Sequence, residues 1–119
     1  MNSSNVVSLH PYFKAHPGKL DAIQALLPVF VERTATEAGC IYYDFSLNGE
    51  EVFCREAYTG AEGILAHLSN VNEQLGEMLK LSDLIRLEVH GSAQELDKLR
   101  EPLAGLNPAW FVLQVGVQR

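Results

Sequence analysis

Clustered positive charge is the first feature that the sequence lacks. No run of lysine or arginine occurs, and nine basic residues stand against fifteen acidic ones, for a formal net charge of -6. Nucleic-acid binding needs clustered cations that replace the counterions of the phosphates, so this composition argues against it. Docking on an anionic membrane is disfavoured for the same reason. The longest apolar runs also fall short of the ~18 residues of a membrane-spanning helix.

Cysteine is scarce, and the common cofactor motifs are missing. Cys40 and Cys54 have no CxxC spacing, and each lies in an apolar run, where a free cysteine usually behaves as a small buried hydrophobe. The chain contains no GxGxxG, P-loop, HExxH or GxSxG sequence, so nucleotide cofactors, zinc proteolysis and serine-hydrolase chemistry have no support. The start "MNSSNVV" lacks the basic and apolar regions of a signal peptide. We therefore expect a cytoplasmic protein without a metal site.

What the chain does have is an ordinary globular composition, with 47% hydrophobic and 20% charged residues. Its 119 residues predict one domain. Strands are predicted where apolar residues alternate, and helices where they recur at helical spacing. The predicted strands are 6–13, 40–47, 51–58, 84–91 and 109–117, and the predicted helices are 19–39, 60–79 and 92–103.

Turn and cap residues support these boundaries. Asn48-Gly49 between two β-type runs is the strongest short-range hairpin signal. Gly39 offers a left-handed cap for the first helix, and Pro28 inside that helix should bend it. Ser92 followed by Glu95 predicts a capping box at the start of the last helix.

The resulting order is β-α-β-β-α-β, followed by α-β. It predicts an α+β fold of the ferredoxin-like, split βαβ type, in which an antiparallel sheet carries both main helices on one face. Alternate apolar positions predict the helix-facing side of each strand, and this side also includes Glu56. The apolar residues of that side are Val7, Leu9 and Phe13; Ile41, Tyr43, Phe45 and Leu47; Val52, Cys54 and Tyr58; and Ile85, Leu87 and Val89.

The opposite face of the predicted sheet is too apolar for free solvent and carries charges of both signs. A second copy's sheet is its natural cover, so we predict a symmetric homodimer through this face. Tyr12 and Tyr42 should lie at the interface. The other residues of this face are Ser8, His10, Asp44, Phe53, Arg55, Arg86, Glu88 and His90.

Several polar residues of this face and of one turn have simple explanations. Asp44, Arg55 and Arg86 are best interpreted as interface ion pairs. His10, His90 and Glu88 could imitate a metal site, but strand alternation and dimer packing explain them. His16 is expected in an exposed turn.

Three segments, in order and at matching spacing, resemble the antibiotic biosynthesis monooxygenase (ABM) family. They are "HPGK" at 16–19, "EAGCIYYDF" at 37–45 and "REAYTGAEGILAHL" at 55–68. The family has a Pro-Gly-Lys turn, a Glu-x-Gly-Cys strand start, and a Glu-x-Trp strand end followed by a helix that carries a histidine. The resemblance covers residues 6–91, with Tyr58 in place of the tryptophan. Residues 92–119 form an extension with an extra C-terminal helix and strand.

The resemblance implies a dimeric α+β barrel with a small-molecule pocket between each sheet and its own helices. Family members include oxygenases that act on polycyclic phenols or quinols without metal or flavin, and also isomerases. The implied ligand is a small aromatic or quinol-like molecule, and no cofactor is expected. Related dimeric barrels bind or degrade haem.

Glu56 and His67 are the candidate catalytic residues. A carboxylate at an otherwise apolar, helix-facing position must be paired, protonated or open to a pocket, and burial would raise its pKa toward neutrality. His67 lies about two turns into the second helix, from where it can point back over Glu56. A carboxylate–imidazole pair orients the ring and raises its basicity, so His67 is the expected base. Tyr58, Tyr43 and Phe45 are the expected substrate-binding residues.

Three functions remain open. In cofactor-free oxygenation, a base removes a phenolic proton, the resulting carbanion reduces dioxygen, and an apolar enclosure keeps water out. Alternatively, Glu56 and His67 form a structural pair that locks the helix onto the sheet, in a dimer that binds a small ligand without turnover or is purely structural. The third is haem binding with His67 as axial ligand, a role that a histidine on this helix has in related barrels.

The last predicted strand, "AWFVLQVGV", would be an aggregation hazard if its edge stayed unpaired. We expect it to pair with an exposed sheet edge, and we favour the edge of the partner subunit.

Overall fold

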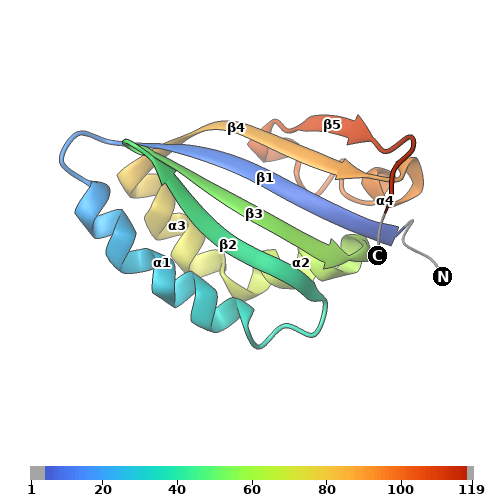
Figure 1. Ribbon diagram of the computed structural model, residues 1–119, viewed down its shortest axis with the longest axis horizontal. Coiled ribbons are helices and arrows are strands. Elements are labelled where there is room, and N and C mark those ends of the chain that lie inside the picture. Colours follow the sequence, from blue (N-terminus) through green and yellow to red (C-terminus); the bar gives the residue numbers. More distant parts are fainter. Residues whose placement is uncertain (1–4, 118–119) are drawn as a thin grey trace.

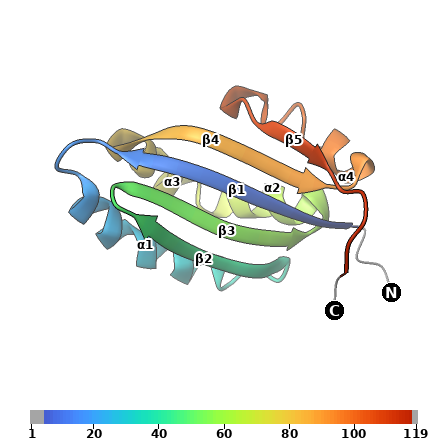
Figure 2. The ribbon, with the colours of Figure 1, turned by 45° about the horizontal axis from the view of Figure 1, so that its top comes forward.

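The computed structural model describes residues 5–117. One five-stranded sheet, in the order β2-β3-β1-β4-β5, carries helices α1, α2 and α3 on one face, as the views from two directions show (Figures 1 and 2). The expected ferredoxin-like α+β fold is confirmed. The elements are β1 (Val6–Ala15), α1 (Leu20–Thr34), β2 (Cys40–Asn48), β3 (Glu51–Thr59), α2 (Gly60–Asn70), α3 (Asn72–Leu81), β4 (Ser82–Gly91), α4 (Ala93–Asp97), the 3-10 helix η2 (Ala104–Leu106) and β5 (Ala109–Val112).

The β2–β3 hairpin forms where it was expected. Asn48 pairs with Glu51 across a two-residue turn, and Gly49 has the positive φ of 61° that this turn needs. The hairpin places the inward-facing residues of β3 next to those of β2, so that Tyr43 lies opposite Glu56 and Phe45 opposite Cys54.

Helix α1 ends at Thr34, five residues before the expected cap at Gly39. The backbone tightens into turns here, because the Thr36 hydroxyl donates to the Arg33 carbonyl at 2.7 Å and the Glu37 amide donates to the Thr34 carbonyl at 3.0 Å. A threonine that satisfies a carbonyl at a helix end competes with continuation of the helix. The early stop takes Glu37 out of the helix. Pro28 lies inside α1, and the helix runs through it.

The single helix predicted over 60–79 is two helices. The chain breaks at Val71, whose φ of -107° and ψ of 17° leave the helical region between α2 and α3. Contacts with α1 accompany the break: the Asn70 side chain donates to the Arg33 carbonyl at 2.8 Å, and the Arg33 guanidinium donates to the Asn70 carbonyl at 2.8 Å. The bend brings α3 back along the sheet beside α1 (Figure 1).

Two β-bulges change which residues face the helices. The register of β2 on β3 shifts between Cys40 and Tyr42, and that of β1 on β4 shifts between Tyr12 and Phe13. Ile41 and Ile85 are the extra residues, and they are 51% and 52% exposed. Their predicted helix-facing positions are therefore wrong, because a bulge reverses the alternation for one residue. Leu47, near the end of β2, is also exposed.

The C-terminal extension packs on its own chain. Ser92 caps α4 as expected, accepting a hydrogen bond from the Glu95 amide at 3.3 Å. The Glu95 carboxylate, expected to complete a capping box, instead accepts from the Ala61 amide at 2.8 Å, at the start of α2. Strand β5 pairs parallel with β4 of the same chain and ends at Val112. The expected pairing with a sheet edge is thus confirmed, but the edge is that of the chain's own β4 and not the favoured edge of a partner subunit, because the turn after η2 returns the strand to its own sheet.

Among the helices that the structure describes, none combines the length and the apolarity needed to cross a membrane. The expected cytoplasmic location stays a prediction.

The close approach of α2 to the β2–β3 hairpin generates a stability prediction. A Cβ on Gly63 would lie 2.9 Å from the Tyr58 Cβ, whereas a Cβ on Gly76 of α3 would meet nothing within 4 Å. Gly63→Ala should lower the free energy of unfolding by about 1–3 kcal/mol through overpacking. Gly76→Ala should raise it by about 0.4–1 kcal/mol. Urea denaturation measures both, and equal effects of the two substitutions would contradict the packing argument.

Candidate functional site

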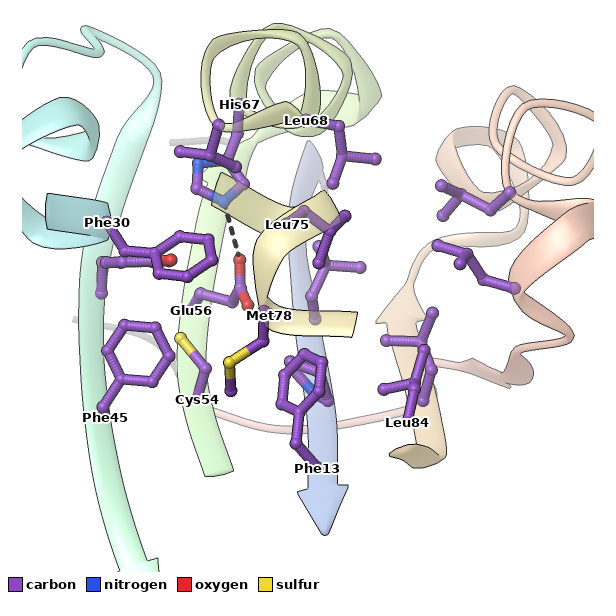
Figure 3. A pocket seen from close by; sticks show the side chains of 17 residues that line it. Phe13, Phe30, Phe45, Cys54, Glu56, His67, Leu68, Leu75, Met78 and Leu84 are labelled. Carbon is purple, nitrogen blue, oxygen red and sulfur yellow. Dashed lines mark ion pairs between the residues drawn. The ribbon is translucent and has the colours of Figure 1, made fainter. Parts of the chain in front are cut away.

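A cavity lies between the sheet and the helices, and we call it the central cavity. Its volume is about 50 Å³. Its wall is almost entirely apolar, and Figure 3 shows the side chains converging from the sheet and the helices. The lining residues are Leu9, Pro11, Phe13, Phe30, Tyr43, Phe45, Cys54, Glu56, His67, Leu68, Val71, Leu75, Met78, Leu84, Leu87, Leu103 and Leu106.

Glu56 projects from β3 into this apolar wall, on the helix-facing side as predicted. It is 4% exposed, and the Tyr58 hydroxyl donates to its Oε1 at 2.5 Å. Burial raises the pKa of Glu56 to about 7, although the hydrogen bonds from Tyr58 and Cys54 oppose the shift. Near neutral pH this carboxyl group can therefore both accept and give a proton.

His67 lies between two carboxylates. Its Nδ1 is 3.1 and 3.0 Å from the two oxygens of Glu37, and its Nε2 is 3.5 Å from Oε1 of Glu56 (Figure 3 shows the second pair). A carboxylate only accepts hydrogen bonds, so the Nδ1–H donates to Glu37 and Nε2 is directed at Glu56 and the cavity. Burial lowers the pKa of His67, while the charge of Glu37 and the hydrogen bond to it oppose the shift.

Sequence reasoning missed Glu37. The carboxylate expected to orient His67 was Glu56, but the hydrogen-bonded one is Glu37, whose side chain is 8% exposed and also accepts from the Asn70 amide at 2.8 Å. The available signal was its place in "EAGC" before β2. Its contact with His67 depends on the early end of α1, which the pattern of apolar residues did not reveal.

Glu37 also borders a second, more open hollow, which we call the outer groove. It lies between the end of α1 and the start of β2. Tyr43 lines both hollows, whereas Glu37 borders only the outer groove and His67 only the central cavity. The outer groove is lined by Val31, Thr34, Ala35, Glu37, Cys40 and Tyr43.

The three expected substrate-binding residues divide into two groups. Tyr43 and Phe45 line the cavity, with the Tyr43 ring centroid 5.1 Å from that of His67 and 5.3 Å from that of Phe45. Tyr58 does not line it: fully buried, it stands behind Glu56 with its ring 5.0 Å from His67. A ligand in the cavity therefore meets Tyr58 only through the Glu56 carboxyl group.

The phenols and the thiol at this site are proton donors rather than nucleophiles. Burial raises the pKa of Tyr43 and of Tyr58 far above the usual range, and it does the same for the thiol of Cys54. Because only the thiolate is a strong nucleophile, Cys54 is inert at neutral pH. Glu56 and His67 remain as the candidate acid–base groups of the cavity wall.

The polar residues of the other sheet face are arranged as ion pairs and ring contacts. Asp44 pairs with Arg55 at 3.1 Å, and His16 in its turn pairs with Asp83 at 3.0 Å. Glu88 binds Arg86 and lies 3.1 Å from the His90 ring nitrogen, and the His10 and His90 ring centroids are 4.5 Å apart. Across residues 5–117, no three His, Cys, Asp or Glu side chains are grouped to hold a metal ion.

The site also does not fit haem. An iron would have to bind Nε2, because Nδ1 is hydrogen-bonded to Glu37, but His67 is 3% exposed and Oε1 of Glu56 lies 3.5 Å from Nε2. This buried acidic group would lie where the haem approaches.

The buried carboxyl group of Glu56 generates a pH prediction. Its pKa rises from 4.5 in the unfolded chain to about 7 in the fold, so between these values the native state binds more protons and loses stability as pH rises. The stability of the wild type relative to Glu56→Gln should therefore fall by up to about 3 kcal/mol between pH 4.5 and 8. Urea unfolding at several pH values measures it, with exposed Glu101→Gln as control. A constant or growing difference would contradict the burial argument.

Comparisons with known proteins agree with this fold. The family model described as antibiotic biosynthesis monooxygenase matches residues 7–73. The crystal structure of MupZ from Pseudomonas fluorescens is 43% identical and superposes with a TM-score of 0.92, covering 97% of this chain and 95% of that chain. No curated protein sequence matches.

More distant structures show the fold alone. Rv0793 from Mycobacterium tuberculosis is 24% identical with a TM-score of 0.63, over 71% of this chain and 91% of that one. A conserved protein from Methanosarcina mazei is 18% identical with a TM-score of 0.69, over 75% and 94%. With its family match over more than half its length and its likeness to MupZ over nearly all of it, the chain belongs to the antibiotic biosynthesis monooxygenase family.

Proposed function

We propose that the protein is an acid–base catalyst that oxygenates a small phenol or quinol without metal or flavin. The observation that carries the proposal is His67 held between Glu37 and Glu56 at the wall of an apolar cavity. A merely structural role would be better filled by apolar residues, because burying ionisable groups is costly and seldom stabilises a fold by itself. Membership of the family supports oxygenation as the reaction.

The proposed reaction begins with loss of the substrate's hydroxyl proton. His67 Nε2 accepts it, with the Nδ1–H bond to Glu37 stabilising the imidazolium that forms. The electron-rich anion transfers an electron to dioxygen and recombines with it, forming a carbon–oxygen bond and a peroxide. His67 or the Glu56 carboxyl group returns a proton to the distal peroxide oxygen. Loss of the proton on the newly oxygenated ring carbon then breaks the O–O bond, so that water leaves and a carbonyl forms. The apolar wall keeps bulk water from the anion.

Tyr58 and Tyr43 have different parts in this proposal. Tyr58 positions Glu56 through its 2.5 Å hydrogen bond and does not contact the substrate. Tyr43 and Phe45, which border the cavity, contact the substrate ring. The proposal thus keeps His67 as base and Glu56 as its partner, and it adds Glu37 as the residue that orients His67.

Oxygen uptake tests the proposal. Wild-type protein, treated with chelator and given naphthols or naphthalene-1,4-diol, should consume dioxygen above the protein-free rate. His67→Ala and Glu56→Gln should each lower kcat about 100-fold or more, the usual contribution of a general acid or base. His16→Ala, in the exposed turn, is the matched control and should retain wild-type turnover. Full activity of His67→Ala would show that the base assignment is wrong. Ligand-induced thermal stabilisation without oxygen uptake would instead favour the non-catalytic binding protein.

The pH profile of Glu37→Gln separates orientation of His67 from simple structural damage. The Glu37 charge raises the pKa of His67, so its removal should move the acid limb of kcat to lower pH while lowering the plateau. A variant that was only destabilised would lose activity while the acid limb of its kcat profile stayed at the wild-type pH.

We also propose that the chain forms a homodimer through the open sheet face. Ile41, Tyr42 and Ile85 are exposed on this face, and the ring centroids of Tyr12 and Phe53 lie 4.7 Å apart. Exposed apolar side chains on a sheet face favour burial against a second subunit.

Sedimentation tests the dimer. Ile85→Lys places a charge on the open face without disturbing the core, so it should convert a wild-type dimer to a folded monomer. Leu65→Lys, at a 38% exposed position on α2, is the matched control and should stay dimeric. A monomeric wild type, or an Ile85→Lys protein that remains dimeric, would overturn the proposal.

A further inference from the structure

The C-terminal extension forms part of the central cavity. Leu106 ends η2 and Leu103 directly precedes it. Both line the cavity together with Leu84 and Leu87 of β4. Figure 3 shows the ribbon of this extension on the side of Leu84, away from Phe30 and Phe45. We call these four leucines the aliphatic wall. We propose that the extension selects the substrate, and that the aliphatic wall receives an alkyl substituent of the phenol or quinol.

The extension is anchored well enough to serve as a wall. Leu96 and Leu99 are fully buried in the core cluster that also contains Val7 and Val89. Strand β5 pairs with β4, and the Leu113 amide continues the pairing by donating to the Gly91 carbonyl at 2.9 Å. These contacts hold Leu103 and Leu106 in place, so their shape acts directly on whatever fills the cavity.

A further set of polar contacts joins the extension to the helix that carries His67. Glu95 accepts from the Ala61 amide at 2.8 Å, and Lys98 lies 3.5 Å from the Glu62 carboxylate and 3.2 Å from that of Glu95. The wall and the acid–base end of the cavity are therefore connected through α2.

The two ends of the cavity come from different parts of the chain. Glu37, Glu56 and His67 all lie inside residues 7–73, which match the family, whereas Leu103 and Leu106 lie beyond them. The family domain thus supplies the proton-transferring groups, and the extension supplies a boundary of the space beside them. Function within a shared fold is varied by such local additions.

The chemistry of the wall indicates the substrate class. Leucine side chains offer no hydrogen-bond donor or acceptor, so this side of the cavity can recognise only apolar groups, by size and shape. Glu56 and His67 lie away from Leu84 in the cavity (Figure 3), and Tyr43 also lines it. A hydroxylated ring placed against Glu56 and His67 would direct a substituent at the leucines. The placement of the substrate hydroxyl group rests on the proposed function. Selection of the alkyl substituent by size does not depend on turnover.

Binding of two ligand series tests the proposal by calorimetry. One series is 4-ethyl-, 4-propyl- and 4-butylphenol, and the other is the alkylbenzenes of the same chain lengths. For the wild type, affinity should rise with alkyl chain length at first and then stop rising before the longest member of each series. In Leu106→Ala it should continue to rise about fourfold for each methylene that becomes buried. Leu106→Phe should move the preference to shorter chains. Leu106 is only partly buried, so both variants should fold.

The matched control is Leu113→Ala, which makes the same substitution in the same extension, at a side chain that is 47% exposed and does not line the cavity. It should leave the chain-length preference unchanged. The proposal is overturned if both Leu106 variants keep the wild-type preference, if Leu113→Ala shifts it equally, or if no protein binds either series. Length selection that is equal for phenols and alkylbenzenes, without oxygen uptake, would retain the wall and reject the oxygenase.

Discussion

The contact of His67 with Glu37 on one side and Glu56 on the other is the constraint on which the rest of the site depends. It needs three segments far apart in sequence: the turn after α1, the middle of β3 and the last turns of α2. Each segment has a local feature that permits the meeting. Thr36 ends the helix before Glu37, Asn70 ties α2 to α1, and Gly63 lets α2 lie against Tyr58.

Burial changes the proton affinity of both groups that face the cavity. The low-polarity surroundings raise the pKa of Glu56 to about 7 and lower that of His67. The Glu56 carboxyl group can therefore exchange a proton with a ligand near neutral pH. Glu37 differs because it touches both His67 and the outer groove. It therefore lies between the His67 ring and the outer groove.

The fold was largely predictable from the sequence, and the errors in that prediction have local causes. Strand alternation, the Asn48-Gly49 turn and the apolar stripe of the helices specify the ferredoxin-like order. The prediction failed where one residue departs from its pattern: Ile41 and Ile85 at bulges, and the helix break at Val71. For the site, an isolated carboxylate among apolar strand residues correctly placed Glu56 on the helix side. Glu37 could not be found in this way, because nothing near it in sequence shows that it turns back toward α2.

The sequence by itself therefore determined the class of fold, the faces of the central strands and the presence of a buried acid, since periodicity and polarity act over a few residues. Only the tertiary structure decided which carboxylate binds Nδ1 of His67, that Tyr58 stands behind Glu56, and that β5 returns to its own sheet. Those outcomes depend on where helices stop and how closely backbones approach. Such distances arise from packing between different elements of the fold, which no local pattern contains.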